Sequence, residues 1–231
     1  MPRNVTRSEL PHRFGRLCAL AAAGAMLIAG TGCQILGVAG VVAKAIDDAT
    51  PKKVYAEYTG LQGKTFAVVV AASQMVQSEF PALVPELTAR ITANLAENAG
   101  AAGFVPAEQV ILFQKQRPRW ALMDREELGK ALGGVDRVVF IELDEFRLRE
   151  PGNRYLWDGQ ASGMVAVIEA DGPLAGEYRF QRMIRVGFPD SSGFSQDNFG
   201  AGVVASTLVS RFSRRAAWMF YDHEEAKDLT F

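Results

Sequence analysis

KTFAVVVA, residues 64–71, is the stretch of sequence that decides the fold. It follows the turn residue Gly63 and is apolar and β-branched almost throughout, without the polar alternation of a surface strand. A continuous apolar run of this length is typical of a strand buried on both faces. The sequence therefore predicts that the folded domain, which we expect from about residue 55, is built around a central strand at this position.

Helices are predicted after this strand. Pro81 and Pro85 suit a helix start, and Gly100 ends the pattern. The segment 106–116 fits either a short helix begun by Pro106 or an irregular strand. Asp124 reads as a helix cap, with Glu127 three residues later. The apolar positions of the first helix recur at i, i+4 spacing: Leu83, Leu87, Ile91 and Leu95.

From Val135 the apolar period changes from helical spacing to two, which predicts three strands over residues 138–149, 157–170 and 177–188. A long helix over residues 197–224 is expected to end the domain. We therefore predict an α/β sandwich: a mixed sheet that contains an antiparallel three-strand meander, with helices packed on one face. In the last strand one face is expected to carry Tyr178, Phe180, Ile184, Val186 and Phe188.

The N-terminus has the pattern of a secretory signal. Four arginines precede the apolar run LCALAAAGAMLIAGTGC, residues 17–33. Its last five residues, AGTGC, resemble the lipobox of bacterial lipoproteins. That resemblance implies a diacylglycerol on Cys33, which becomes the first mature residue, and Gln34 after it resembles an outer-membrane address. The expected organisation is a signal peptide at 1–32, a membrane-proximal tether at 33–54 and one domain at 55–231.

An uncleaved membrane anchor is the alternative interpretation of the N-terminus. Apolar residues continue to Val42 with few interruptions, and a run of this length is sufficient to span a bilayer. Both interpretations tether the domain to a membrane. An intact mass that still includes residues 1–32 would establish the uncleaved anchor.

The amino-acid composition argues against several classes of function. The chain has 25 Lys and Arg against 26 Asp and Glu, and removal of residues 1–32 leaves 21 basic and 25 acidic side chains, a net charge of −4. This balance disfavours nucleic acid as a partner. Cys33 is then the only thiol and His223 the only imidazole. We expect no cofactor, no metal site and no enzymatic activity.

The order of elements resembles the small α/β domain of the TolB N-terminal region and of CsgG-like outer-membrane lipoproteins. The likeness spans about residues 64–221 and is carried by KTFAVVVA, the helix from Pro81, the passage from Glu127 to Val139 and the terminal helix. It implies a scaffold or assembly role near the cell envelope, with no catalytic residues to carry over. The membrane-spanning hairpins of pore-forming members have no counterpart in this sequence.

Three groups of residues are candidates for function. Arg117, Arg119 and Trp120 combine residue types enriched at interface hot spots, although Trp120 also suits the core. Glu142 and Asp144, two apart on a strand, are expected to share a face, either as an acid/base pair or as solvated residues paired with Arg179 or Arg185. The pattern G-x-G-x-x-A at residues 200–205 opens a helix but lacks the preceding strand of a dinucleotide site.

The sequence thus predicts a membrane-anchored envelope lipoprotein whose domain is a non-enzymatic scaffold or accessory subunit. Its expected partners are the membrane, through the lipid on Cys33, and other envelope proteins, through a sheet edge or residues 117–120. The alternative is a periplasmic domain that binds a small molecule or a glycan, with or without hydrolysing it, on the acidic face of the sheet.

Overall fold

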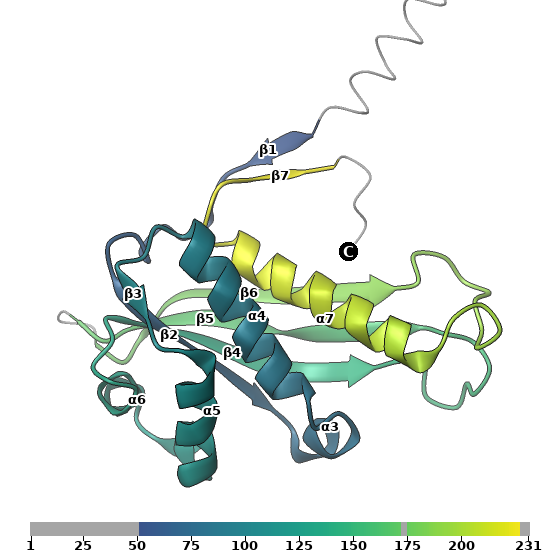
Figure 1. The fold of residues 1–231 in the computed structure, drawn as a ribbon, viewed down its shortest axis with the longest axis horizontal. Helices are drawn as coiled ribbons and strands as arrows, with labels where there is room; N and C mark the ends of the chain where they lie inside the picture. Colours follow the sequence, from purple (N-terminus) through teal and green to yellow (C-terminus); the bar gives the residue numbers. More distant parts are fainter. Residues whose placement is uncertain (1–50, 172–174, 227–231) are drawn as a thin grey trace, which may run out of the picture. The chain divides into compact units, whose positions relative to one another are not determined.

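The computed structural model describes residues 51–171 and 175–226. Its main sheet has five strands in the order β3-β2-β4-β5-β6 (Figure 1). Strands β3, β2 and β4 run parallel, and β4, β5 and β6 form an antiparallel meander. The strands are β2 (Thr65–Ala72), β3 (Gly103–Phe104), β4 (Arg137–Arg147), β5 (Gly159–Glu169) and β6 (Tyr178–Phe188). The predicted mixed sheet and its meander are confirmed.

Strand β2 is buried on both faces, as its sequence predicts. Side chains alternate along a strand, so the odd and even residues of the run reach different cores. Phe66, Val68 and Val70 belong to the larger core, whereas Ala67 and Val69 belong to a smaller core on the opposite face. All five are essentially inaccessible to solvent.

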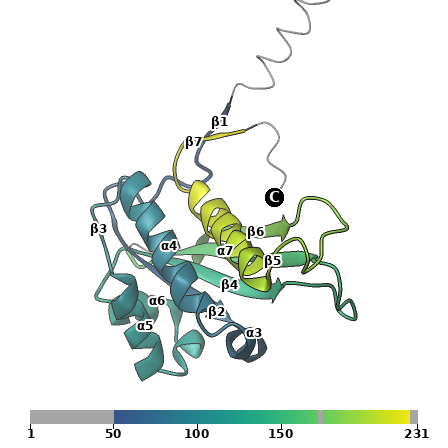
Figure 2. The ribbon, with the colours of Figure 1, turned by 45° about the vertical axis from the view of Figure 1, so that its right-hand side comes forward.

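The larger core is covered by α4 (Leu83–Asn98) and α7 (Ala201–Trp218), which lie side by side across the sheet in Figures 1 and 2. The predicted stripe of α4 is buried at all four positions, and α7 buries Val204, Leu208, Phe212 and Ala216. Helix α7 is shorter than the predicted 197–224. In the preceding loop the Asn198 side chain accepts a hydrogen bond from the Ser195 backbone N–H, a turn that competes with the helix.

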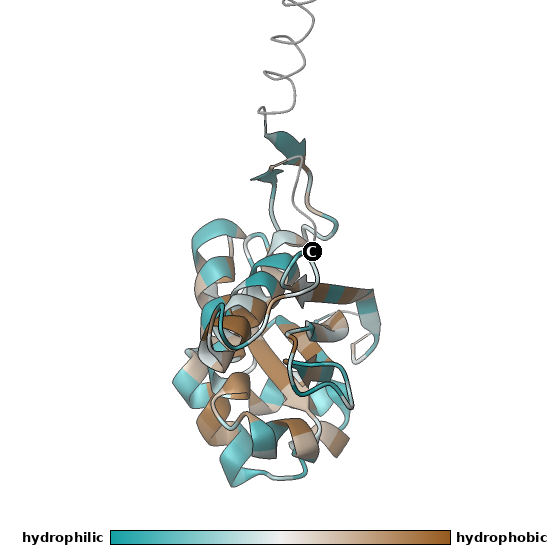
Figure 3. Ribbon diagram, turned by 90° about the vertical axis from the view of Figure 1, so that its right-hand side faces the viewer, coloured by the Kyte–Doolittle hydropathy of each residue, from teal (hydrophilic) through white to brown (hydrophobic). Residues whose placement is uncertain are grey.

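Two further helices, α5 (Ala107–Gln116) and α6 (Arg125–Ala131), contribute to the smaller core through Val110, Leu128 and Leu132. The prediction placed helices on one face only. The structure adds these two on the other face, with α5 beside β2 and α6 against β4 and β5. The ambiguous segment 106–116 is a helix, and Asp124 caps α6 by accepting from the Glu126 N–H at 2.9 Å. In Figure 3 the inner strands are mainly brown and the helices alternate between brown and teal.

Several short elements were not predicted from the sequence. Helix α3 (Gln74–Glu79) follows β2 directly and is capped by the Ser73 hydroxyl, which accepts from Val76 N at 3.3 Å. A 3₁₀ turn, η1 (Trp120–Leu122), links α5 to α6. Strands β1 (Lys52–Val54) and β7 (His223–Glu225) pair in a separate two-stranded sheet.

The prediction for the faces of the last strand was wrong at Tyr178. The pairing of β5 with β6 shifts register between Val167 and Ile168, so Tyr178 lies opposite Ile168 and Phe180 opposite Val167. Tyr178 therefore packs against the smaller core, whereas Phe180 packs against the larger one. An extra residue in one strand of a pair reverses the side-chain alternation beyond it.

A polar network joins the starts of β2 and β4. Asp136 accepts hydrogen bonds from the Thr65 backbone N–H at 2.8 Å and from its hydroxyl at 2.9 Å. These two bonds, the backbone one first, hold the pKa of Asp136 below its usual value. These hydrogen bonds fix the register of β2 relative to β4 at the point where the two parallel strands begin.

We predict that Asp136→Asn makes the stability of the domain less sensitive to acid. A carboxyl whose folded pKa is depressed stabilises the fold above its unfolded pKa of about 3.9, and this stabilisation is lost as the pH falls through the folded pKa. Urea unfolding measures the free energy of unfolding at pH 7 and at pH 3. The decrease in this free energy from pH 7 to pH 3 should be smaller in the variant than in the wild type. Exposed Asp144→Asn is the control, and an equal effect of the two substitutions would contradict this account.

Candidate functional site

The predicted contact residues lie in the segment from Arg117 to Met123, which joins α5 to α6. Arg117 ends α5 and its guanidinium lies 5.4 Å from the centre of the Phe113 ring. Trp120 is half-buried, with its ring 6.1 Å from that of Phe140. Arg119 is exposed, and Leu122 is 84% exposed. The segment therefore combines an anchored indole with exposed cationic and apolar side chains.

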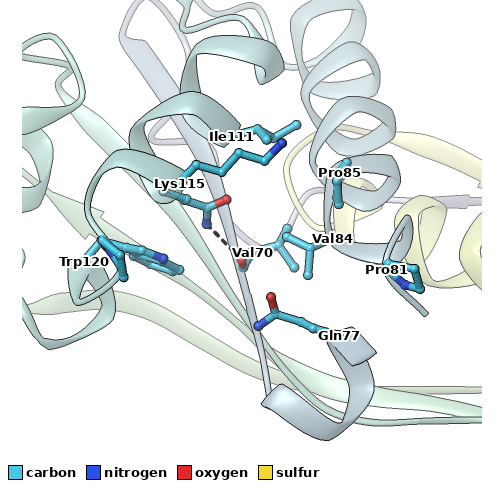
Figure 4. Close-up of a pocket in the computed structure, with 10 residues that line it drawn as sticks. Val70, Gln77, Pro81, Val84, Pro85, Ile111, Lys115 and Trp120 are labelled. Carbon is cyan, nitrogen blue, oxygen red and sulfur yellow. Dashed lines mark hydrogen bonds between the residues drawn. The ribbon is translucent and has the colours of Figure 1, made fainter. Parts of the chain in front are cut away.

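One cleft, of about 370 Å³, borders this segment at the outer edge of β2 (Figure 4). We call it the edge cleft. It lies between α4 and α5, with Trp120 on one side, Gln77 of α3 on another and Val70 at its base. Its other lining residues are Pro81, Val84, Pro85, Ile111, Gln114, Lys115 and Pro118. The cleft thus offers one cation and two amides beside apolar side chains.

Two glutamines occupy the edge of β2 because β3 is too short to cover it. Strand β3 pairs only with Thr65 and Phe66. Farther along, Gln114 donates its side-chain N–H to the Val70 carbonyl at 3.0 Å, a bond drawn in Figure 4. Gln77 donates to the Ala72 carbonyl at 2.7 Å. These side chains satisfy backbone acceptors that a longer strand would otherwise pair, which closes this edge against a further strand.

A second cleft, of about 470 Å³, lies on the other side of Trp120 against the open face of the sheet. We call it the face cleft. Trp120 lines both clefts, and the face cleft also contains Glu142 and Tyr178. The Arg125 guanidinium lies 3.9 Å from the centre of the Tyr178 ring, within the range of a cation–π contact. Residues 117–123 therefore form the wall that separates two surface depressions.

The charge of this wall is mainly positive. Lys115, Arg117 and Arg119 are within five positions of one another, and neither Arg117 nor Arg119 forms an ion pair with any residue that the structure describes. Asp124 instead caps α6, and Glu126 binds Lys130 at 2.7 Å. The cationic side chains remain available to an acidic partner, whereas part of the nearby negative charge is already engaged.

The acidic residues of β4 do not form the expected pair. The pairing of β4 with β5 shifts register between Leu143 and Glu145, so Glu142 lies opposite Met164 and Glu145 opposite Ser162. Asp144 falls in the bulge, and Glu145 takes the place expected for it. Glu145 is engaged by Arg147 at 2.7 Å and by Gln160 at 2.6 Å. The expected pairing partner Arg179 instead contacts Glu169, at 3.5 Å.

The remaining candidate residues lie in positions where they cap or pack elements of the fold. Gly200 is the N-cap of α7 and follows a loop rather than a strand, as the G-x-G-x-x-A interpretation expected. The predicted helix included His223, but α7 ends at Trp218 and His223 lies in β7. Its ring stacks on that of Trp218 at 4.4 Å and hydrogen-bonds Glu225 at 3.0 Å. Cys33 lies outside the described residues. Over residues 51–171 and 175–226 no group of three or more His, Cys, Asp or Glu side chains is placed to hold a metal ion.

The sequence pattern indicated Arg117, Arg119 and Trp120, but it carries no signal for Leu122 or for the two glutamines at the β2 edge. An exposed leucine carries no local signal, and a glutamine on a helix reads as ordinary polar surface. Both observations require the three-dimensional arrangement. The part of the chain that the structure describes contains no helix long and apolar enough to cross a membrane.

Comparison with known proteins finds partial likeness to solved structures only. No family model matches the chain, and no curated protein matches it in sequence. Lipoprotein GNA1162 from Neisseria meningitidis is 17% identical, with 66% of this chain and 97% of that chain covered at a TM-score of 0.42. The PelC dodecamer from Paraburkholderia phytofirmans is 11% identical, with 75% and 99% covered at 0.41.

A third match is protein XCC0632 from Xanthomonas campestris, of family DUF330, at 12% identity, 74% and 90% coverage and a TM-score of 0.35. All three TM-scores lie below 0.5, and all three identities lie below 20%. At this level the likeness does not bear on the function of this chain.

Proposed function

We propose that the chain is an envelope lipoprotein whose α/β domain is a non-enzymatic, protein-binding module. A lipid on Cys33 would hold it at a membrane, preferentially the outer one, with the domain in the periplasm. The observation that carries the binding role is the Arg117–Met123 segment, where exposed Leu122 and two arginines surround a half-buried tryptophan between two clefts. Arginine and tryptophan are the residue types most enriched among interface hot spots.

The proposed mechanism is positional. A membrane tether confines the domain near membrane partners, which raises their effective concentration without any new contact. The partner would supply carboxylates for Arg117 and Arg119 and an apolar pocket for Leu122. Trp120 is already packed on Phe140, so little side-chain entropy would be lost when it is covered.

We predict that the triple substitution Arg117→Ala, Arg119→Ala, Leu122→Ala abolishes capture of a partner from mildly solubilised native membranes. Each truncated hot-spot residue costs about 1–2 kcal/mol of binding free energy, so the triple variant should bind at least about a hundredfold more weakly. The measurement is the enrichment of co-purified protein with the full-length chain as bait. An unrelated domain fused to residues 1–50 controls for membrane association alone.

The matched control variant is Arg154→Ala, Tyr155→Ala, which removes an exposed cation and an aromatic residue that is 81% exposed from the β4–β5 loop. It should retain the partner. Equal enrichment by the wild type, the control variant and the triple variant would contradict the assigned surface. No enrichment above the residue 1–50 fusion in repeated preparations would contradict the scaffold function itself.

A second candidate function rests on the face cleft, which brings Glu142 together with the rings of Trp120 and Tyr178. A carboxylate beside aromatic rings suits a small polar molecule or a sugar. Glu142→Ala with Asp144→Ala separates the two functions. A protein-binding module keeps its partner after both substitutions, whereas a carboxylate-dependent site loses its ligand or activity.

A further inference from the structure

Strand β6 is the far edge of the sheet. Among the described residues no strand pairs with its outer side, in contrast to the β2 edge, which Gln77 and Gln114 close. The strand is 11 residues long, so it presents a row of backbone groups without a strand partner. A long edge of this kind is a site at which an extended segment can add to a sheet.

The backbone groups that point outward can be assigned. Arg211 of α7 donates to the Gly187 carbonyl at 2.7 Å, so this carbonyl faces away from β5. Backbone groups along a strand alternate in direction, and the outward groups therefore belong also to Arg185, Met183 and Gln181. The register with β5 is continuous from Phe180 to Phe188, and no proline interrupts this part of β6. Residues 181–185 thus form a regular, open edge.

The side chains along this edge are basic. Strand β6, with the sequence YRFQRMIRVGF, contains three arginines and no acidic residue. A cleft of about 490 Å³ follows the edge and is lined by Arg182, Arg185, Arg215 and Glu57, together with Met183, Ile184 and Met219. Arg182 binds Glu57 at 2.7 Å, but the two side chains are 62% and 40% exposed, and a surface ion pair of this kind is weak and readily exchanged. Arg185 has no ion pair with a described residue.

We propose that the outer edge of β6 binds an extended acidic segment of a partner protein by strand addition. The main chain of the segment would bond residues 181–185, and its carboxylates would contact Arg182 and Arg185. A second copy of this chain fits less well, because edge-to-edge pairing would bring two sets of arginines together. Met183 is 65% exposed and would be covered by the added strand. This surface goes beyond the Arg117–Met123 segment and does not depend on it.

The probe is an end-capped, fluorescently labelled peptide, VEVTVEVT, compared with its lysine counterpart VKVTVKVT. Fluorescence anisotropy with the full-length chain in mild detergent should show at least tenfold tighter binding of the glutamate peptide, weakened by salt. Met183→Pro should reduce binding at least tenfold, because proline removes an outward N–H while leaving the bonds to β5 intact. Arg185→Glu, which changes no backbone group, should reduce it by a similar factor.

Arg154→Glu, which makes the same charge change on another surface, should bind the glutamate peptide like the wild type. The Arg117, Arg119 and Leu122 triple variant should do so too, which separates this test from that of the proposed function. Equal binding of the two peptides, or wild-type binding by both β6 variants, would overturn the proposal. A wild-type dimer that Met183→Pro converts to a monomer would overturn it as well, because the occupant would then be a second copy.

Discussion

Gly163→Ala is expected to destabilise the domain by about 3 kcal/mol, at the upper end of the usual cost of overpacking. A Cβ atom at Gly163 would lie 2.4 Å from the Glu142 carbonyl oxygen and 3.0 Å from the Leu143 Cα. Both atoms belong to the backbone of β4, immediately before the bulge at Asp144. Strand β5 lies between β4 and β6, so it cannot move away from one neighbour without disturbing the other.

Thermal unfolding measures this effect directly. For a domain of this size the expected loss corresponds to a fall in Tm of about 6–12 °C. Gly202→Ala is the matched control, because Gly202 lies in α7 and a Cβ there meets nothing within 4 Å. Alanine is the better helix former by up to about 1 kcal/mol, so the control should be neutral or slightly stabilising. A Gly163→Ala variant that is as stable as wild type would show that the bulge can relax.

The bulge illustrates why some features of the sheet could not be predicted from the sequence. Residues 64–71 were correctly predicted as a buried strand, because their pattern is local. The three strands of the meander were predicted within a few residues for the same reason. The places of Asp144 and Tyr178 depend on register shifts between strands, which no local period reveals. Each register shift reverses the alternation of side chains expected for a regular strand. One residue in each strand, Asp144 in β4 and Tyr178 in β6, therefore lies elsewhere than predicted.

In the candidate site too, some features could be predicted from the sequence and others could not. Arg117, Arg119 and Trp120 were singled out by residue type alone, and the structure places both arginines at the surface. The two clefts on either side of Trp120 depend on how α5 and η1 approach the sheet. Because strand β3 pairs only with the first two residues of β2, glutamine side chains rather than a strand cover the rest of this edge. Helix α3 was missed because six residues are too few to establish a helical period.

The two edges of the sheet differ in a way that bears on function. At the β2 edge, α4 and α5 enclose the strand and side-chain amides satisfy its carbonyls. At the β6 edge, arginines flank a regular backbone, and within residues 51–171 and 175–226 Arg211 is the only side chain that bonds its outward groups, at the Gly187 carbonyl. Native proteins protect edges by covering or charging them. This domain covers one edge and charges the other, so only the charged edge remains open to an extended partner of opposite charge.

Arg137→Met is expected to lower the free energy of unfolding by about 2–3 kcal/mol at neutral pH. The Arg137 side chain is 8% exposed, pairs with Asp171 and lies 3.6 Å from Glu169. Breaking a fully buried pair costs about 3–5 kcal/mol because a charge is left uncompensated. The cost is smaller here because Lys64 still binds Asp171 at 2.6 Å and Tyr58 still donates to Glu169 at 2.9 Å.

Arg179→Met is the matched control, since it removes the same charge from the same carboxylate, Glu169, at 3.5 Å. The Arg179 side chain is 47% exposed, so its loss should cost less than about 1 kcal/mol. Urea unfolding of both variants measures the difference, which then isolates the effect of burial from that of charge. Equal losses in the two variants would contradict a special role for the buried guanidinium.

The pH dependence of Arg137→Met provides a second, independent test. Hydrogen bonds from Lys64 and Arg137 hold the pKa of Asp171 below its usual value in the folded state. The stabilisation that this provides is present above the unfolded pKa of about 3.9 and is lost as the pH falls through the folded pKa. Without Arg137 the depression is smaller, so less stability remains to be lost in acid. The difference in the free energy of unfolding between wild type and variant should therefore become smaller as the pH falls from 5 to 2. A purely steric defect would leave this difference constant.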